Sequence, residues 1–230
     1  MPTIRIGLCL LVKNELNGCL VDIPNLPLDE FDEVFAVDAG SQDGTQEFLL
    51  SQGITVYQQP QKGLNAAYHH AVNCSECDAI VVFFPKGTLS VESLKKFRSL
   101  LEDGNKLVVA SRQIRGSINE EDASLWRPRK WMVWWLSLFA ALLWKKEGYW
   151  VRDVLHGYKG FYCEAFRKMD ISKEGLSVDV EMVINSYKLQ LRRCEFPVEE
   201  IPRLHGKSNF PFWKTGKQLF KYIVKELIHY

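Results

Sequence analysis

The sequence predicts an α/β fold in which a mostly parallel, Rossmann-like sheet is flanked by helices. In the first half, short apolar runs alternate with segments of helical spacing, and this alternation is typical of a parallel sheet covered by helices. Each apolar run ends in small or polar residues, as strands do where a loop leads into a helix. With 47% hydrophobic residues in 230, the chain can build a large core within one domain.

The first half contains five expected strands and three expected helices. The strands are predicted at residues 4–12, 33–37, 55–57, 79–84 and 106–110. The helices are predicted at 45–52, 63–72 and 91–102. Asp43 and Ser90 stand at positions typical of N-caps for two of these helices, because short polar side chains can accept a bond from the first turn.

After residue 112 the pattern changes. A loop of basic and acidic residues (113–130) leads into a tryptophan-rich segment, 131–144. A helix near 178–189, a strand at 192–198 and an amphipathic C-terminal helix at 213–228 follow. No linker is long enough to separate domains, so we expect one domain over 1–230 with a helical extension at its end.

Composition excludes several classes of function. A net charge of +1 argues against a nucleic-acid partner, because such binding needs a concentrated basic field. Of six cysteines only Cys74 and Cys77 form a CxxC pair, which predicts reduced thiols rather than a zinc site. The apolar run at 4–12 is short and lacks a cleavage-like segment, so we predict no signal peptide.

Three loops at predicted strand ends carry small and polar residues just before a helix. They are residues 13–15 (KNE), 38–45 (DAGSQDGT) and 62–67 (KGLNAA). Glycine lets the backbone approach a ligand closely, and helix N-termini favour phosphate. Asp38 could accept hydrogen bonds from a base or a ribose. The alternative for 38–45 is a capped turn without a ligand. Neither GxGxxG after the first strand nor GxxxxGK[ST] occurs, which argues against dehydrogenases and P-loop proteins.

Seven motifs in register resemble a known family. VDAGSQDGT (37–45) resembles the VDDGSxDGT signature of family 2 glycosyltransferases with the GT-A fold, and VKNE (12–15) is similar to their first-strand loop. KGLNAAYHHAV (62–72) and VVASR (108–112) are similar to later segments of the same family. RDVLHGYKGFYCEAF (152–166), SVDVEMV (177–183) and PRLHGKS (202–208) resemble the dolichol-phosphate mannose synthase-like branch.

The resemblance implies inverting transfer of a sugar from a nucleoside-diphosphate sugar. It divides the chain into a nucleotide-sugar half (1–112), an acceptor half (113–210) and the C-terminal helix (211–230). It assigns one set of residues to the nucleotide sugar: Lys13, Glu15, Asp38, Gly40, Ser41, Lys62, Gly63, Asn65 and Arg112. Asp153, Asp179 and Glu181 would face the sugar and the reacting centre.

The acceptor implied by the resemblance is a polyprenyl phosphate or a surface glycan precursor. Its phosphate would be held by Arg127, Arg129, His156, Lys159, Arg203, His205 and Lys207. A phosphate oxygen is already anionic near neutral pH, so its attack needs positioning rather than deprotonation. A sugar hydroxyl would need a carboxylate base, for which Asp153, with Asp179 behind it, is the candidate. Either carboxylate could instead simply pair with Arg152 or a lysine.

The sequence departs from the family at two places. The second aspartate of the DDGS signature is Ala39, and the metal-binding D-x-D motif falls on Phe84-Pro85-Lys86. In the family these carboxylates hold Mg²⁺ or Mn²⁺ against the diphosphate. No metal site is therefore predicted, and we hypothesise that the Lys86 ammonium stabilises the diphosphate, as a catalytic residue without metal. The alternative is a protein that has lost catalysis and only binds the nucleotide sugar or acts as a scaffold.

Two segments bear on membranes. The tryptophan-rich run 131–144 has about 14 residues, whereas a spanning helix needs about 20. Basic residues flank it, as in helices at a bilayer surface, but a helix buried on all sides would read the same way. In 213–228, lysines 214, 217, 221 and 225 recur at helical spacing. We predict a cytoplasmic protein at the inner membrane surface, with a solvated helix face as the alternative.

Overall fold

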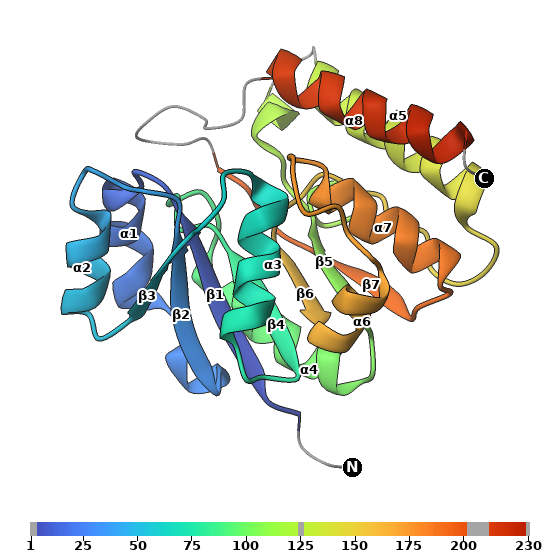
Figure 1. The fold of residues 1–230 in the computed structure, drawn as a ribbon. Helices are drawn as coiled ribbons and strands as arrows, with labels where there is room; N and C mark the ends of the chain where they lie inside the picture. The colour runs from blue at the N-terminus through green and yellow to red at the C-terminus, as the bar shows by residue number, and fades with distance from the viewer. Residues whose placement is uncertain (1–3, 124–126, 202–211, 229–230) are drawn as a thin grey trace.

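The computed structural model describes residues 4–123, 127–201 and 212–228. One sheet of seven strands runs through it in the order β3-β2-β1-β4-β6-β5-β7 (Figure 1). All pairings are parallel except those of β6 with β4 and β5. This confirms the predicted mostly parallel sheet. The strands are β1 (Ile6–Val12), β2 (Glu33–Asp38), β3 (Thr55–Gln58), β4 (Ala79–Phe83), β5 (Leu107–Ser111), β6 (Lys159–Tyr162) and β7 (Arg193–Pro197).

Helices cover both faces of the sheet. In Figure 1, α3 and α7 lie in front of it and α4 lies behind it, while α5 and α8 run along its upper edge. The helices are α1 (Leu16–Asp22), α2 (Thr45–Ser51), α3 (Leu64–Cys74), α4 (Lys95–Glu102), α5 (Pro128–Trp144), α6 (Cys163–Lys168), α7 (Val178–Lys188) and α8 (Phe212–Ile228). Short 3-10 turns stand at Ile23–Asn25, Leu28–Glu30, Val91–Leu94 and Glu120–Ala123.

The parallel strands end together at one edge. Val12, the last residue of β1, pairs with Asp38, the last residue of β2, and Leu10 pairs with Phe83 at the end of β4. Every residue of β1 and β4 is buried, because helices cover both faces of these central strands. The loops that leave these strands therefore converge at the carboxyl edge, where open α/β sheets bind their ligands.

Several local predictions differ from the structure. The N-cap of α2 is Gly44 rather than Asp43. Asp43 instead accepts bonds from the backbone N–H of Thr45 (3.1 Å) and of Leu16 (3.0 Å), so it ties the starts of α1 and α2 together. The predicted helix 91–102 begins as a 3-10 turn and becomes α-helical only at Lys95, and Ser90 makes no side-chain capping bond.

The structure contains three elements, α1, β6 and α6, that were not predicted from the sequence. α1 and α6 are seven and six residues long and show little periodicity, and no capping signal like the one before the similarly short α2 was recognised at their starts. β6 has four residues and includes Lys159 and Gly160, both poor strand signals. Gly160 is needed because an added Cβ would lie 2.7 Å from the Phe97 ring of α4. Close packing therefore selects a residue that propensity disfavours.

The tryptophan-rich segment forms α5, which is apolar on two sides. One side is buried and carries Val133, Ser137, Ala140, Ala141 and Trp144. The other side leaves Trp131, Trp135, Phe139 and Leu142 exposed by 42–76%. Burial in the core therefore accounts for only half of the helix surface. Within the described residues, no helix combines the length and hydrophobicity of a membrane span.

Candidate active site

Two adjoining cavities lie at the carboxyl edge of the sheet. The first, here the loop cavity, has a volume of about 390 Å³ and is lined by the loops after β1, β2 and β3. The second, the charged cavity, has a volume of about 290 Å³ and lies among α5, the segment just before β6 and the segments after β4 and β5. The two share four lining residues: Leu64, Phe84, Lys86 and Leu176. They form one continuous site with a common wall at the end of β4.

The loop cavity is shaped by a turn that Asp38 holds closed. One oxygen of this fully buried carboxylate accepts bonds from the backbone N–H of Gly40 (2.8 Å) and Ser41 (2.9 Å) and from Gln46 Nε2 (2.7 Å). Its other oxygen contacts the Ser41 hydroxyl. Asp38 does not line the cavity, whereas Gly40, with a φ of 84°, does. The structure thus places Asp38 behind the residues that line the loop cavity.

A second pair of bonds joins this turn to the loop after β1. Asn14 donates its backbone N–H to Ser41 Oγ (2.8 Å), and its side-chain oxygen accepts from the backbone N–H of Gln42 (2.8 Å). Lys13 and Glu15 flank Asn14, and both line the loop cavity. These bonds hold the two loops together. The sequence-predicted residues Lys13, Glu15 and Gly40, which lie on these loops, all line the loop cavity.

The third loop contributes Lys62 and Gly63, but not Asn65. Lys62 and Gly63 line the loop cavity. The amide of Asn65 is buried and faces α7, where Nδ2 donates to Glu181 Oε1 (3.1 Å) and to the Ser172 carbonyl (2.9 Å). Glu181 also accepts from the backbone N–H of Ser172 (2.7 Å) and is only 1% exposed. The structure brings these two predicted site residues to each other, away from both cavities.

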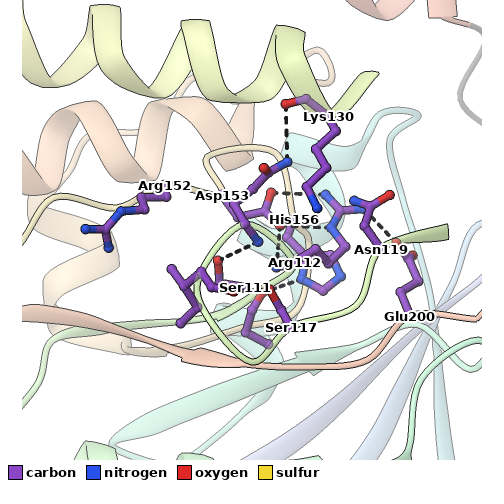
Figure 2. A network of polar contacts seen from close by, with 12 residues as sticks. Ser111, Arg112, Ser117, Asn119, Lys130, Arg152, Asp153, His156 and Glu200 are labelled. Atoms are coloured by element: carbon purple, nitrogen blue, oxygen red, sulfur yellow. Dashed lines mark hydrogen bonds and ion pairs between the residues drawn. The ribbon is translucent and has the colours of Figure 1, made fainter. Parts of the chain in front are cut away.

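The charged cavity is organised around an ion pair between the partly exposed Arg112 and the buried Asp153 (Figure 2). The Arg112 guanidinium makes two bonds to the fully buried Asp153 carboxylate, Nε to Oδ2 at 2.8 Å and Nη2 to Oδ1 at 3.0 Å. Its third nitrogen reaches Glu200 Oε2 at 3.1 Å. Burial alone would raise the pKa of Asp153, but the Arg112 charge outweighs it and holds the pKa well below its usual range.

Asp153 is consequently an ionised partner of Arg112 rather than an available base. Both of its oxygens are engaged by Arg112, whose backbone N–H also donates to Oδ2 at 2.9 Å. The backbone at 152 and 153 is in turn fixed by Glu195 of β7, which accepts from both N–H groups at 2.8–2.9 Å. The sequence assigned Arg112 to the diphosphate channel, and the structure places it on the wall of the charged cavity.

Asp179, at the start of α7, also lines the charged cavity and has a buried cation beside it. Lys159 of β6 is fully buried and donates to Asp179 Oδ1 at 2.6 Å and to the His156 carbonyl. A buried lysine is stable as a cation only with such a partner. Lys159 is therefore withdrawn from the cavity surface by Asp179, although the sequence assigned it to the acceptor phosphate.

Lys86 lies where the two cavities meet and lines both. Its ammonium lies 4.7 Å from the centroid of the Phe84 ring. The loop that carries it is packed tightly on α1, since a Cβ added at Gly18 would lie 2.2 Å from the Pro85 carbonyl oxygen. The buried Asp22 carboxylate accepts from the backbone N–H of Gly87 at 2.8 Å. Burial raises the pKa of Asp22 to about 6, although backbone hydrogen bonds from Gly87 and Lys86 act to lower it.

The remaining predicted cations lie near the start of α5 or outside the described residues. Arg129 lines the charged cavity, next to Lys130, which bonds to Asp122 Oδ1 at 2.5 Å. Arg127 also pairs with Asp122, at 2.9 Å. Arg203, His205 and Lys207 lie outside the residues that the structure describes.

At the expected position of the D-x-D motif, and among the other residues that the structure describes, the side chains do not fit a divalent metal ion. The expected ligand positions hold Phe84, Pro85 and Lys86, none of which offers a carboxylate. Among the described residues, no group of three or more His, Cys, Asp or Glu side chains is placed to hold a metal. The carboxylates of the charged cavity, Asp179 and Glu200, already pair with Lys159 and Arg112. A lysine at the shared wall repels a second cation.

Four site residues escaped sequence reasoning. Glu200, Gln113 and Asn119 line the charged cavity, and Asp22 fixes the Lys86 loop. Glu200 precedes the 202–208 motif by only two residues, which is the one signal that could have found it. Asp22 lies on a helix that the sequence did not reveal, so nothing pointed to it.

The comparisons with known proteins agree with this architecture. The family model described as glycosyl transferase family 2 matches residues 11–170, more than half of the chain. The chain belongs to this family. It is 24% identical over 179 residues to glycosyltransferase AglJ of Haloferax volcanii, covering 77% of this chain and 57% of that protein. The chain thus spans little more than half the length of this relative. An uncharacterized protein of Methanocaldococcus jannaschii is also 24% identical, over 213 residues, covering 89% of this chain and 85% of that protein.

Solved structures confirm the GT-A fold of this family 2 glycosyltransferase. Glucosyl-3-phosphoglycerate synthase from Mycobacterium tuberculosis in complex with uridine diphosphate superposes with a TM-score of 0.72 at 15% identity. The same synthase with Mn²⁺, UDP-glucose and phosphoglyceric acid also gives a TM-score of 0.72, at 18% identity. Each alignment covers 96% of this chain and 79% of the synthase. The chain therefore shares the fold of these synthase structures and belongs to the glycosyl transferase family 2.

Proposed function

We propose that this glycosyltransferase binds a nucleoside-diphosphate sugar in the loop cavity and transfers the sugar, with inversion, to an acceptor in the charged cavity. The observation that carries this proposal is that the two cavities meet at Lys86. Inverting transfer needs the acceptor and the leaving group on opposite sides of the reacting carbon. Support for two substrates comes from the two adjoining cavities, and a structurally similar synthase binds UDP-glucose together with phosphoglyceric acid.

The charge of the loop cavity suits a diphosphate. Among its described lining residues, three are lysines (Lys13, Lys62 and Lys86) and one, Glu15, is acidic. Leu11, Val37 and Pro60 provide an apolar surface for a base. We assign Asp38, Ser41, Asn65 and Glu181 to positioning, because their polar atoms are used within the protein.

Transfer in this proposal needs no metal. As the bond between the sugar and the diphosphate breaks, negative charge grows on the leaving oxygen, and the Lys86 ammonium at the common wall stabilises it. The ammonium is half-buried and held on a loop clamped by Gly18 and Asp22. A fixed cation in a partly dehydrated site costs little reorganisation when the charge appears.

The test begins with donor binding. Thermal shifts with UDP-, GDP-, CDP- and dTDP-sugars identify the nucleotide, because a bound ligand raises the apparent stability. We expect Lys86→Met to weaken binding of that donor about 10- to 100-fold, the value of one or two charge-assisted bonds. Lys168→Ala, an exposed lysine on α6, is the matched control and should bind normally.

Turnover decides the metal question. We expect sugar transfer by the wild type to be unchanged by a chelator. Loss of activity with chelator and recovery with Mn²⁺ would overturn the role of Lys86. Tight nucleotide binding with no turnover on any acceptor would instead favour an inactive binding or scaffolding protein.

The acceptor is proposed to be a lipid-linked one, a polyprenyl phosphate or a glycan precursor, at the inner surface of the membrane. Support comes from α5, whose outer side exposes Trp131, Trp135 and Leu142 beside the charged cavity. Tryptophans with flanking lysines and arginines suit a bilayer interface. Vesicles with anionic lipid should sediment the wild type but not Trp135→Ser/Leu142→Ser, which keeps the inner side of α5. Equal sedimentation of the two proteins would contradict this.

A further inference from the structure

His156 is a buried side chain at the charged cavity whose orientation is fixed. It lies just before β6, is 4% exposed and lines the cavity. Its Nδ1 contacts the carbonyl oxygen of Ala110 on β5. A carbonyl can only accept a hydrogen bond, so Nδ1 must carry the hydrogen. In a neutral imidazole the other nitrogen, Nε2, then holds a lone pair.

The surroundings keep this imidazole neutral. Burial lowers its pKa to about 4, helped by the Arg112 charge and opposed by the charges of Asp153 and Glu200. The Tyr158 ring covers one side, with ring centroids 4.9 Å apart. At physiological pH Nε2 is therefore a hydrogen-bond acceptor and not a donor.

Nε2 has no hydrogen-bond partner within the described part of the chain. A buried polar atom without a hydrogen bond costs free energy, and in native proteins nearly all such atoms have a hydrogen-bond partner. Since His156 lines the cavity, a bound molecule can supply one. That molecule must offer a hydrogen. A phosphate monoester at pH 7 is mostly the dianion, whose oxygens carry no hydrogen and would repel the lone pair, whereas a hydroxyl group satisfies it.

We propose that the attacking group of the acceptor is a hydroxyl whose hydrogen is accepted by His156 Nε2. This inference rests on the proposed function and chooses between its two acceptors: a glycan precursor with a free sugar hydroxyl, not the phosphate oxygen of a polyprenyl phosphate. His156 is then a catalytic residue and not a phosphate ligand.

The transfer step balances as follows. The acceptor oxygen forms a bond to the anomeric carbon as its proton passes to Nε2. The bond from that carbon to the diphosphate oxygen breaks, and the electron pair leaves with the nucleoside diphosphate beside Lys86. The imidazolium then returns its proton to water. Because the pKa of free His156 is low, the proton moves only as the new bond forms and the oxygen becomes acidic.

A matched pair of substitutions isolates Nε2. In His156→Asn the side-chain amide can still donate to the Ala110 carbonyl, but nothing replaces Nε2. In His156→Gln the longer side chain can bring its amide oxygen near the Nε2 position. We expect His156→Asn to reduce kcat at least 100-fold with unchanged donor thermal shifts, and His156→Gln to recover acceptor KM but not kcat.

The acceptors used are a polyprenyl phosphate and a polyprenyl diphosphate that carries one sugar, each with the donor found by thermal shift. Transfer only to the sugar-bearing lipid supports the proposal. Transfer to the polyprenyl phosphate at an equal or higher rate overturns it, as does His156→Asn activity within threefold of the wild type.

A second measurement does not depend on turnover. Nitrogen-15 spectra of the histidine rings should show Nδ1 protonated and Nε2 unprotonated at pH 7 in the wild type. A proton on Nε2 at this pH overturns the inference whatever the activity. If the wild type binds none of the four donors, the proposed function fails instead, and the spectra still decide the state of His156.

Discussion

The two cavities of this glycosyltransferase are built in different ways. The loop cavity is formed by turns whose bonds are local or join neighbouring loops, such as Asp38 to Gly40 and Ser41, two and three residues on. The charged cavity depends on bonds between distant segments, since Arg112 reaches 41 residues to Asp153 and 88 residues to Glu200. A local turn forms with its own sequence, whereas the distant network exists only when the whole sheet is assembled. The charged cavity should therefore be the part coupled most strongly to global stability.

The largest effect is expected from removing Arg112, which lies at the centre of the charged-cavity network, and it tests whether this cavity is coupled to global stability. Arg112→Met leaves Asp153 buried and ionised without its partner, and we expect a loss of about 3–5 kcal/mol in the free energy of unfolding. Urea titration followed by circular dichroism measures it. Lys168→Ala, which removes an exposed pair with Glu164, should change stability by less than about 0.5 kcal/mol. A loss below about 1 kcal/mol for Arg112→Met would show that the network is peripheral to folding.

A substitution beside the Lys86 loop, at the wall shared by the two cavities, should change stability by an intermediate amount. Alanine normally stabilises a helix relative to glycine by about 0.5–1 kcal/mol. At Gly18 of α1 the new Cβ would meet the Pro85 carbonyl oxygen at 2.2 Å, so we expect Gly18→Ala to cost about 1–3 kcal/mol instead. Donor affinity should fall as well, because the Lys86 loop must move. Leu20→Ala, an exposed site on the same helix, is the control. A stabilised Gly18→Ala protein with normal donor binding would refute the clamp.

The smallest effect is a pH dependence from the same clamp. Because burial raises the pKa of Asp22 to about 6, the folded protein holds this proton more tightly than the unfolded chain does. Its contribution to stability is full below about pH 4 and is lost as the pH rises through 6. The Asp22→Asn protein should lack this component, so its stability relative to the wild type should rise by about 1–2 kcal/mol between pH 4 and pH 7. Unfolding of both proteins across this range, with Asp29→Asn as the exposed control, checks it; a constant difference would contradict it.

Sequence reasoning succeeded where the signal is local. The strand runs, the DAGSQDGT turn and the KGLN loop indicated the parallel sheet and the edge where its loops converge. The roles of single residues were harder to predict. Asp38 and Asn65 look like ligand-binding groups in the sequence, but their polar atoms hold neighbouring segments. Whether a carboxylate faces a cavity or is bound by an arginine depends on strand order, and the position of antiparallel β6 in the sheet cannot be read from four residues.

The direction of β6 has a consequence for how this enzyme can vary. Because β6 runs opposite to its neighbour β5, the chain leaves β5 and re-enters the sheet at the same edge, where Val109 pairs with Lys159. Residues 112–158 therefore form one long connection whose two ends lie close together. The entropic cost of closing such a connection grows slowly with its length. Loops of this segment that do not carry the Arg112–Asp153 pair or the buried side of α5 can therefore be lengthened or shortened while β1 to β4 keep their register. Under the proposed function, changes in these loops would alter the acceptor side of the site and leave the loop cavity as it is.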